Sequence, residues 1–154
     1  MNEDEFRTTY HSLNPNRCVY EKSIFTQSCD CQHSTRINIA ERVGIGCTND
    51  SARRLCDEFL THLRQQAGFA LKMTNIVGNL LPHSKEVQVQ KGGLAGLVPG
   101  LPNTREAAIK SIFDLIEAAA KSCDNDLSRY PYQQLIPSIS HHVVAKRVRR
   151  KDRQ

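Results

Sequence analysis

Five of the six cysteines fall within one segment of 39 residues. They are Cys18, Cys29, Cys31, Cys47 and Cys56, with the spacing C-x10-C-x-C-x15-C-x8-C. Four thiolates complete either a tetrahedral zinc site or the corners of an iron–sulfur cluster. The segment holds one cysteine more than either site requires, so the sequence predicts that four of the five coordinate a metal centre.

The spacing favours one kind of centre over the other. Structural zinc sites in short domains usually have paired C-x2-C knuckles, and this sequence contains none. Iron–sulfur clusters accept ligands from separated loops, and a helix N-terminus beside them stabilises their negative charge. We therefore expect an iron–sulfur cluster, with zinc as the alternative. The expected ligands are Cys29, Cys31, Cys47 and Cys56, with Cys18 as the substitute for one of them.

Some of these residues also have interpretations that involve no metal. Cys29 and Cys31 flank a single residue in a polar loop, which makes them candidates for a thiol redox pair. Cys56 falls on an apolar helical stripe, where cysteine behaves as a small hydrophobic side chain. His33 competes as a ligand or is an ordinary surface histidine. Cys123, distant from the others, is expected to pack in the core.

Motifs of the common enzyme classes are missing from the sequence. The run from Lys91 to Leu97 is rich in glycine, but its lysine precedes the glycines, so it is not a phosphate-binding loop. His141 and His142 are adjacent and point in different directions on a helix or a strand, so one ion seldom binds both. No His-Glu-x-x-His motif or nucleophile elbow occurs. We favour a protein without catalytic activity.

The net charge of +5 is concentrated at the C-terminus. Residues 146–154 carry six of the 21 basic residues and one of the 16 acidic residues, so the rest of the chain has 15 of each. A neutral body does not predict the broad basic face of a dedicated DNA-binding protein. The tail is either a solubilising terminus or a candidate arm for nucleic acid or an acidic partner.

The overall composition indicates a single soluble domain. The chain has 154 residues, of which 39% are hydrophobic and 24% are charged, and this is near the usual size of one domain. No apolar run approaches the roughly 20 residues that span a bilayer, and the acidic N-terminus does not resemble a secretory signal. We expect a cytoplasmic protein that does not enter the membrane, in a compartment where thiols stay reduced.

One long helix is the clearest element near the cysteines. Asn49 and its neighbours offer N-caps, and apolar residues then recur at helical spacing from Ala52 to Ala70. Cys47 precedes this helix and Cys56 lies within it, so the positive end of the helix dipole is expected to lie near the metal. A short helix is expected over residues 34–42.

The pattern changes in the second half of the chain. Residues 86–90 alternate between polar and apolar, which predicts a short strand. The glycine- and proline-rich run 92–102 predicts a connector whose leucines form a candidate protein-binding patch. A second amphipathic helix is expected from Asn103 or Thr104 to Cys123. The remainder is expected to be loop with one short element.

Together these elements predict an α+β fold that is mainly helical. It has two long amphipathic helices, a cysteine-rich N-terminal loop region and a minor strand or hairpin. Residues 1–17 are expected to be an extended, flexible lead-in, residues 18–140 a single metal-binding domain, and residues 141–154 a basic C-terminal tail.

The expected function is that of a small metal-binding protein that acts in electron transfer, in sensing or as an accessory to a larger enzyme. A protein partner follows from each of these roles. The alternatives are a structural zinc protein, an adaptor that uses its basic tail, and a thiol redox protein that uses Cys29 and Cys31.

Overall fold

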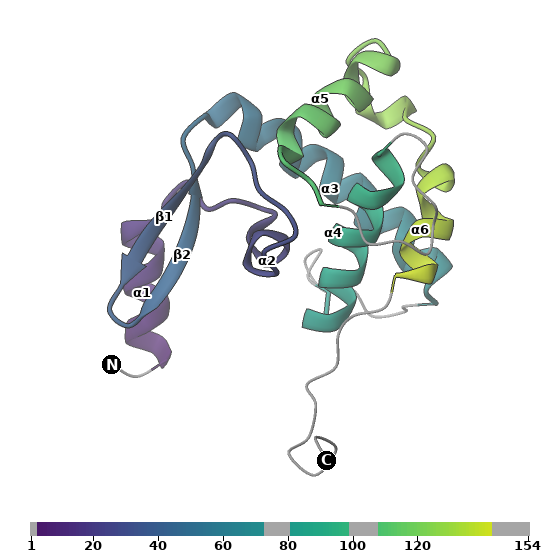
Figure 1. The fold of residues 1–154 in the computed structure, drawn as a ribbon. Coiled ribbons are helices and arrows are strands. Elements are labelled where there is room, and N and C mark those ends of the chain that lie inside the picture. The colour runs from purple at the N-terminus through teal and green to yellow at the C-terminus, as the bar shows by residue number, and fades with distance from the viewer. Residues whose placement is uncertain (1–2, 73–80, 99–107, 143–154) are drawn as a thin grey trace.

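A computed structural model describes residues 3–72, 81–98 and 108–142 of the chain. The fold is mainly helical with one antiparallel hairpin (Figure 1), which confirms the predicted class. The strands are β1 (Ser34–Ile39) and β2 (Arg42–Cys47). The helices are α1 (Glu3–Leu13), α2 (Glu21–Phe25), α3 (Asp50–Ala70), α4 (His83–Leu97), α5 (Ile112–Ser122) and α6 (Ile136–His141), with short 3₁₀ turns η1 (Leu127–Arg129) and η2 (Tyr132–Leu135).

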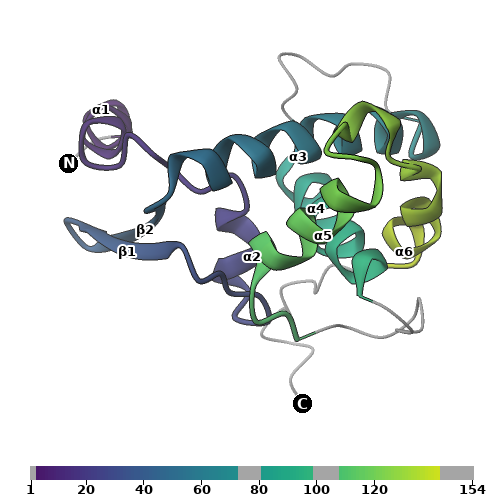
Figure 2. The same ribbon diagram turned by 90° about the horizontal axis from the view of Figure 1, so that it is seen from above.

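The elements gather into two neighbouring parts. Helix α1 and the β1–β2 hairpin lie at one end, and helices α4, α5 and α6 lie at the other (Figures 1 and 2). Helix α3 starts directly after the hairpin and runs along the helical part, as the view from above shows (Figure 2). The start of α3 therefore lies where the hairpin meets the helical core.

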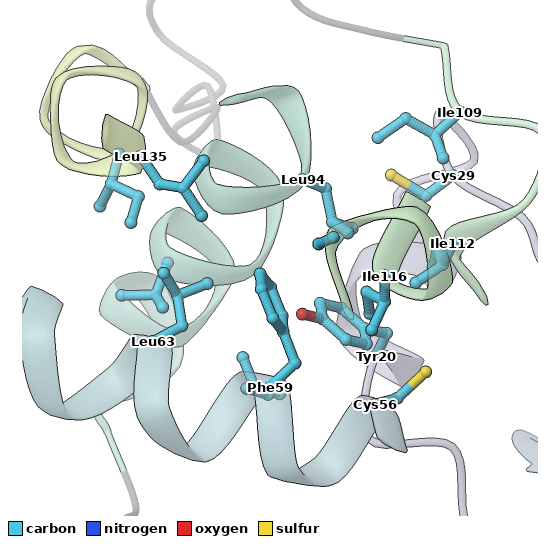
Figure 3. Packing of buried hydrophobic residues seen from close by; sticks show 14 of the residues in the cluster. Tyr20, Cys29, Cys56, Phe59, Leu63, Leu94, Ile109, Ile112, Ile116 and Leu135 are labelled. Carbon is cyan, nitrogen blue, oxygen red and sulfur yellow. The ribbon is translucent and has the colours of Figure 1, made fainter. Parts of the chain in front are cut away.

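Helix α3 confirms the strongest prediction from the sequence. Asn49 is its N-cap, and the side chain of Asn49 accepts a hydrogen bond of 3.0 Å from the backbone N–H of Ala52. The apolar stripe of α3 is buried, and Phe59 and Leu63 are fully enclosed at the centre of the core. Figure 3 shows Phe59 packed near Tyr20, which precedes α2, and near Leu94 of α4 and Ile116 of α5. Helix α3 is thus the element on which the rest of the fold packs.

The predicted helix over residues 34–42 is wrong, because this segment forms β1 and the turn into β2. The hairpin register pairs Ser34 with Cys47 and Ile39 with Arg42. Two residues connect the strands, and Ala40 adopts a left-handed φ of 55° that no α-helix contains. Alternation of Ile37 and Ile39 with polar neighbours is the signal for a strand that a helical interpretation overlooks.

The predicted strand at residues 86–90 is also wrong, because these residues lie in α4. This helix is buried on several sides, so it lacks the one-sided apolar stripe of a surface helix. Glu86 and Gln90 are one helical turn apart and hydrogen-bond to each other, with 3.2 Å between Gln90 Nε2 and Glu86 Oε1. Glu86 and Gln90, which the alternating pattern places on the exposed face of a strand, are instead buried residues that hydrogen-bond to each other on a helix.

The predicted glycine-rich connector is also wrong over residues 92–97, because these residues continue α4. A Cβ atom at Gly92 would lie 2.6 Å from Ile139 Cα, and one at Gly96 would lie 2.9 Å from Leu135 Cδ2. These glycines allow α6 and η2 to approach α4 closely. Leu94 is fully buried, so it is not part of an exposed protein-binding patch; residues 99–102 lie outside the described residues.

The second amphipathic helix begins later than predicted. Helix α5 starts at Ile112 after the N-cap Ser111, and its buried stripe from Ile112 to Ala120 is the expected one. Ile109 is not helical, because it forms a β-bridge with Cys29. Residues 103–107, where the predicted start lies, are outside the described residues. The chain after α5 contains η1, η2 and α6 rather than one short element.

Residues 3–13 form helix α1 instead of the extended lead-in that the sequence predicts. Three acidic residues occupy its first turn, where they interact favourably with the helix dipole. Tyr10 is buried, and its hydroxyl donates a hydrogen bond to Glu21 at the start of α2. None of the described helices combines the length and apolar character needed to cross a bilayer. Residues 143–154, with the basic tail, lie outside the described part of the chain.

Candidate metal centre

Backbone pairing brings Cys18 beside Cys47. The backbone N–H of Cys18 donates to the carbonyl of Ile45 over 3.0 Å, and the N–H of Cys47 donates to the carbonyl of Asn16 over 2.8 Å. Arg17 and Gly46 form an antiparallel bridge between these two bonds. The segment before α2 therefore pairs with β2 over residues 16–18 through an isolated bridge. Two cysteines that are far apart in the sequence are held side by side.

A second set of backbone bonds brings Cys31 to the same place. The chain turns after Cys31, where the N–H of Ser34 donates to the Cys31 carbonyl over 3.1 Å. Thr48 then donates to the carbonyl of His33 over 2.8 Å, which joins the start of β1 to the end of β2. Cys31 and Cys47 thus lie at the same open end of the hairpin.

Helix α3 supplies the fourth cysteine. Its first residue, Asp50, follows Cys47 by only three positions, so the chain passes directly from β2 into the helix. Cys56 lies on the buried face of α3, one turn beyond Ala52. The N-terminus of α3 carries unpaired backbone N–H groups and the positive end of the helix dipole, which favour thiolates nearby.

Cys18, Cys31, Cys47 and Cys56 line one small enclosed cavity of about 20 Å³. The other walls are mainly apolar, with Val19, Ala52, Ile112 and Phe113 among them. This junction between the hairpin and the helical core is therefore surrounded by four sulfur-bearing side chains in a dry environment. All six cysteines, each in the described part of the chain, are thiols without a disulfide.

The four thiols surround the cavity rather than converge on one point. Within residues 3–72, 81–98 and 108–142, no three side chains of cysteine, histidine, aspartate or glutamate are arranged to hold a single metal ion. The sulfur atoms are nevertheless close enough to interact electrostatically. Charge on Cys31 or Cys47 raises the pKa of both Cys18 and Cys56.

Two of the four thiols, Cys18 and Cys56, are poor nucleophiles in the absence of a cation. Burial raises the pKa of Cys18 to about 12, with smaller contributions from neighbouring thiolates. Burial likewise raises the pKa of Cys56 well above the usual thiol range, again with contributions from the other cysteines. Reactive cysteines have lowered pKa values, so the arrangement suits ligation, in which a metal cation displaces the thiol protons.

Arg53 is a site residue that sequence reasoning missed. It lines the cavity, and its Nε atom is buried without a hydrogen-bond partner among the described residues. The far end of the guanidinium is anchored, because one of its NH2 groups donates to Asp50 over 2.8 Å. The sequence contains one signal that Arg53 belongs to the site. Arg53 precedes Cys56 by three positions, and residues at this spacing share a helix face.

Two further side chains, those of His33 and Tyr20, line the same cavity. His33 lies against the ring of Phe113, with 5.0 Å between the ring centroids. Tyr20 contributes its ring, and Figure 3 shows its hydroxyl directed away from Cys56. Among the described residues, His33 is the only histidine that lines this cavity.

Cys29 does not line the cavity. It is 5% exposed and belongs to the hydrophobic core, and the β-bridge to Ile109 holds its backbone. Figure 3 shows its side chain beside Ile109 and separate from Cys56. Cys29 and Cys31 consequently occupy different environments, which does not favour a thiol redox pair. Cys123 caps the end of α5 and packs against the core, as its sequence position predicts.

Comparison of the chain with protein-family models, with curated proteins and with solved structures finds no match. The chemistry of the four-cysteine cavity is therefore the basis for a functional assignment.

Proposed function

We propose that this chain is an iron–sulfur protein whose cluster is held by Cys18, Cys31, Cys47 and Cys56. The observation that carries the proposal is the meeting of four thiols, from four separate segments, around one enclosed cavity. Cys18 takes the place that sequence reasoning gave to Cys29. Iron–sulfur clusters are held by four cysteine thiolates in this way.

The spacing of the thiols supports a cluster in preference to a single ion. Zinc–sulfur bonds of about 2.3 Å in a tetrahedron require four sulfur atoms that nearly touch. No such convergence occurs among the described residues. A cluster is larger than an ion, so its ligands stand further apart around it, as ligands from four separate segments can do.

The charges at the site also fit. A cluster with four thiolate ligands carries net negative charge, and hydrogen bonds to its sulfur atoms stabilise that charge. The Nε–H of Arg53 is a buried cationic donor at the cavity, and no residue in the described part of the chain accepts a hydrogen bond from it. The N-terminus of α3 adds favourable dipole charge. The buried Arg53 Nε–H is costly unless an acceptor occupies the site.

The ligand set suggests what the protein does. Four protein ligands leave no open coordination position, so the cluster would supply one-electron transfer or sensing rather than a binding place for substrate at iron. Val19, Ile112 and Phe113 contribute apolar walls to the site. We place the protein in a reducing compartment such as the cytoplasm and expect a protein partner that exchanges electrons with it or reads its state.

Zinc is the second candidate, and one observation favours it. The cavity has a volume of about 20 Å³, which is closer to the size of one ion than to that of a cluster. A zinc ion there would require the four thiols to move inward. Its role would then be structural, since it would tie the hairpin to α3.

The experiment that tests the proposal is anaerobic purification of the full chain, followed by measurement of iron, acid-labile sulfide and zinc. A brown protein with iron and sulfide in equal amounts is expected. Substitution of any one of Cys18, Cys31, Cys47 and Cys56 by serine should remove most of the iron, because each is a ligand.

Two other cysteines provide matched controls. Cys29→Ala and Cys123→Ala should keep the wild-type iron content, because neither thiol lines the cavity. Loss of iron in Cys29→Ala together with retention in Cys18→Ser would refute the proposed ligand set. Stoichiometric zinc without sulfide would select the second candidate, and a metal-free protein would refute both.

A further inference from the structure

A second cavity lies on another side of Cys18. Its volume is about 420 Å³, and Cys18 contributes to the walls of both cavities. The second cavity lies between the start of α2, the middle of α3 and the first half of α4, which contribute Lys22, Arg64 and Glu86. Sites for small molecules have volumes of roughly 300 to 1,000 Å³, so this cavity is large enough for a metabolite.

The first of its two carboxylates, Glu21, is fully used inside the protein. Glu21 is only 5% exposed. It accepts hydrogen bonds from the Tyr10 hydroxyl, from the backbone N–H of Ile45 over 2.8 Å, and from Arg17 Nε over 3.2 Å. This carboxylate joins α1, β2 and α2, and has little capacity left for a molecule in the cavity.

The second carboxylate, Glu86, is used in the same way. It is 4% exposed and accepts three hydrogen bonds from Arg64: Nε donates to Oε1 over 2.7 Å and to Oε2 over 3.1 Å, and Nη2 donates to Oε1. Gln90 donates a further bond to Glu86. Arg64 is therefore held in place by a buried acid at the wall of the cavity.

The accessible charges of the cavity are therefore cationic. The side chain of Arg17 is 49% exposed and that of Arg64 is 16% exposed, while both carboxylates are nearly covered. Lys22 is half-buried, and no ion pair joins it to another residue in the described part of the chain. Arg17 and Arg64 are themselves the partners of Glu21 and Glu86, so among the lining residues the cavity carries one cation in excess, Lys22.

From this arrangement we propose that the second cavity binds a small organic anion with two carboxylate groups or a phosphate group. Arg17 and Arg64 form the fixed part of the site, and Lys22 supplies the charge that the anion neutralises. The occupant lies beside the Cys18 side chain. The binding does not require a metal at the neighbouring site, so it can be tested independently of the proposed cluster.

The test measures binding to the full-length protein by titration calorimetry at low salt. Succinate represents the dicarboxylates and glycerol 3-phosphate represents the phosphates, with succinamide and glycerol as their neutral counterparts. At least one of the anions should bind with a stoichiometry of one, and the neutral molecules should not. Succinate binding alone assigns a dicarboxylate, and glycerol 3-phosphate binding alone assigns a phosphate.

The variant Lys22→Gln should weaken binding roughly tenfold or more, because a hydrogen bond to a charged group is lost. Lys22 forms no ion pair with the residues that the structure describes, so this variant should fold normally, which its thermal melting curve checks. The control is Lys121→Gln at the end of α5, which does not line the second cavity and should bind as the wild type does. Failure of both anions to bind, or equal effects of the two substitutions, would overturn the proposal.

Discussion

A single arginine connects the start of α3 with the four-cysteine cavity. Arg53 has one end on Asp50, whose pKa is lowered by this hydrogen bond, and its buried Nε–H lies at the cavity wall. A buried donor without an acceptor costs on the order of 1 to 3 kcal/mol. A cluster sulfur or a cysteine thiolate would remove that cost. Arg53 is therefore a positioning residue for the proposed cluster.

The substitution Arg53→Gln should lower the reduction potential of the cluster by roughly tens of millivolts, because a cation and hydrogen bond that stabilise the more negative reduced state are weakened. The measurement is a redox titration of the purified protein. Arg54→Gln is the control, since Arg54 also pairs with Asp50, over 2.9 Å, but is 76% exposed and does not line the cavity. Equal shifts in both variants would show that only surface charge matters.

Among the elements, α4 is the helix whose close packing depends most on glycine residues, which have no side chain. Its glycines are embedded between α3, α6 and η2, where a methyl group would meet Leu63, Ile139 or Leu135. The neighbour at Gly92 is backbone, which cannot move aside, whereas the neighbour at Gly96 is the end of a leucine side chain. The same element also carries Glu86 and Gln90 toward the second cavity, so its position matters for ligand binding as well.

Gly92→Ala should destabilise the protein by up to about 2 kcal/mol. Overpacking costs about 1 to 3 kcal/mol, and the helix propensity of alanine returns about 1 kcal/mol. Gly96→Ala gains the same propensity and meets only a flexible side chain, so its stability should stay near that of the wild type. Urea denaturation of both variants measures the difference. A larger loss in Gly96→Ala would contradict the packing of α4 against α6.

At the scale of the whole molecule, the four-cysteine cavity joins two parts with different internal support. The helical part has a continuous hydrophobic core built around α3. The hairpin has only two strands and one short paired segment, Asn16–Cys18. A two-stranded hairpin is marginally stable alone. A metal centre at the junction would therefore stabilise the hairpin more than the helical core.

Removal of the metal centre should produce a local loss of protection from hydrogen exchange. We expect faster exchange over β1, β2 and residues 16–18 in the metal-free protein, with α3 and α5 remaining protected, because these regions open separately. Hydrogen–deuterium exchange followed by mass spectrometry compares the two forms. A uniform increase across the chain would mean that the centre supports the entire fold, and no change would mean that it supports neither part.

Several features could be predicted from local patterns alone. The boundaries of α3, its buried stripe and the N-cap region follow from helical periodicity and capping chemistry, which depend on neighbouring residues. The predominantly helical class follows as well. Helix α4 could not be predicted, because its burial on several sides removes the one-sided periodicity that identifies a helix.

The density of cysteines, the separation of Cys123 from the others and the long helix beginning after Cys47 are properties of the amino-acid order. The tertiary structure decided which cysteines share a cavity. Cys18 reaches it because residues 16–18 pair with β2, and Cys29 is kept away because its backbone pairs with Ile109. Both pairings join segments distant along the chain, and no local pattern encodes them. Long-range backbone hydrogen bonds form only when the whole core is assembled.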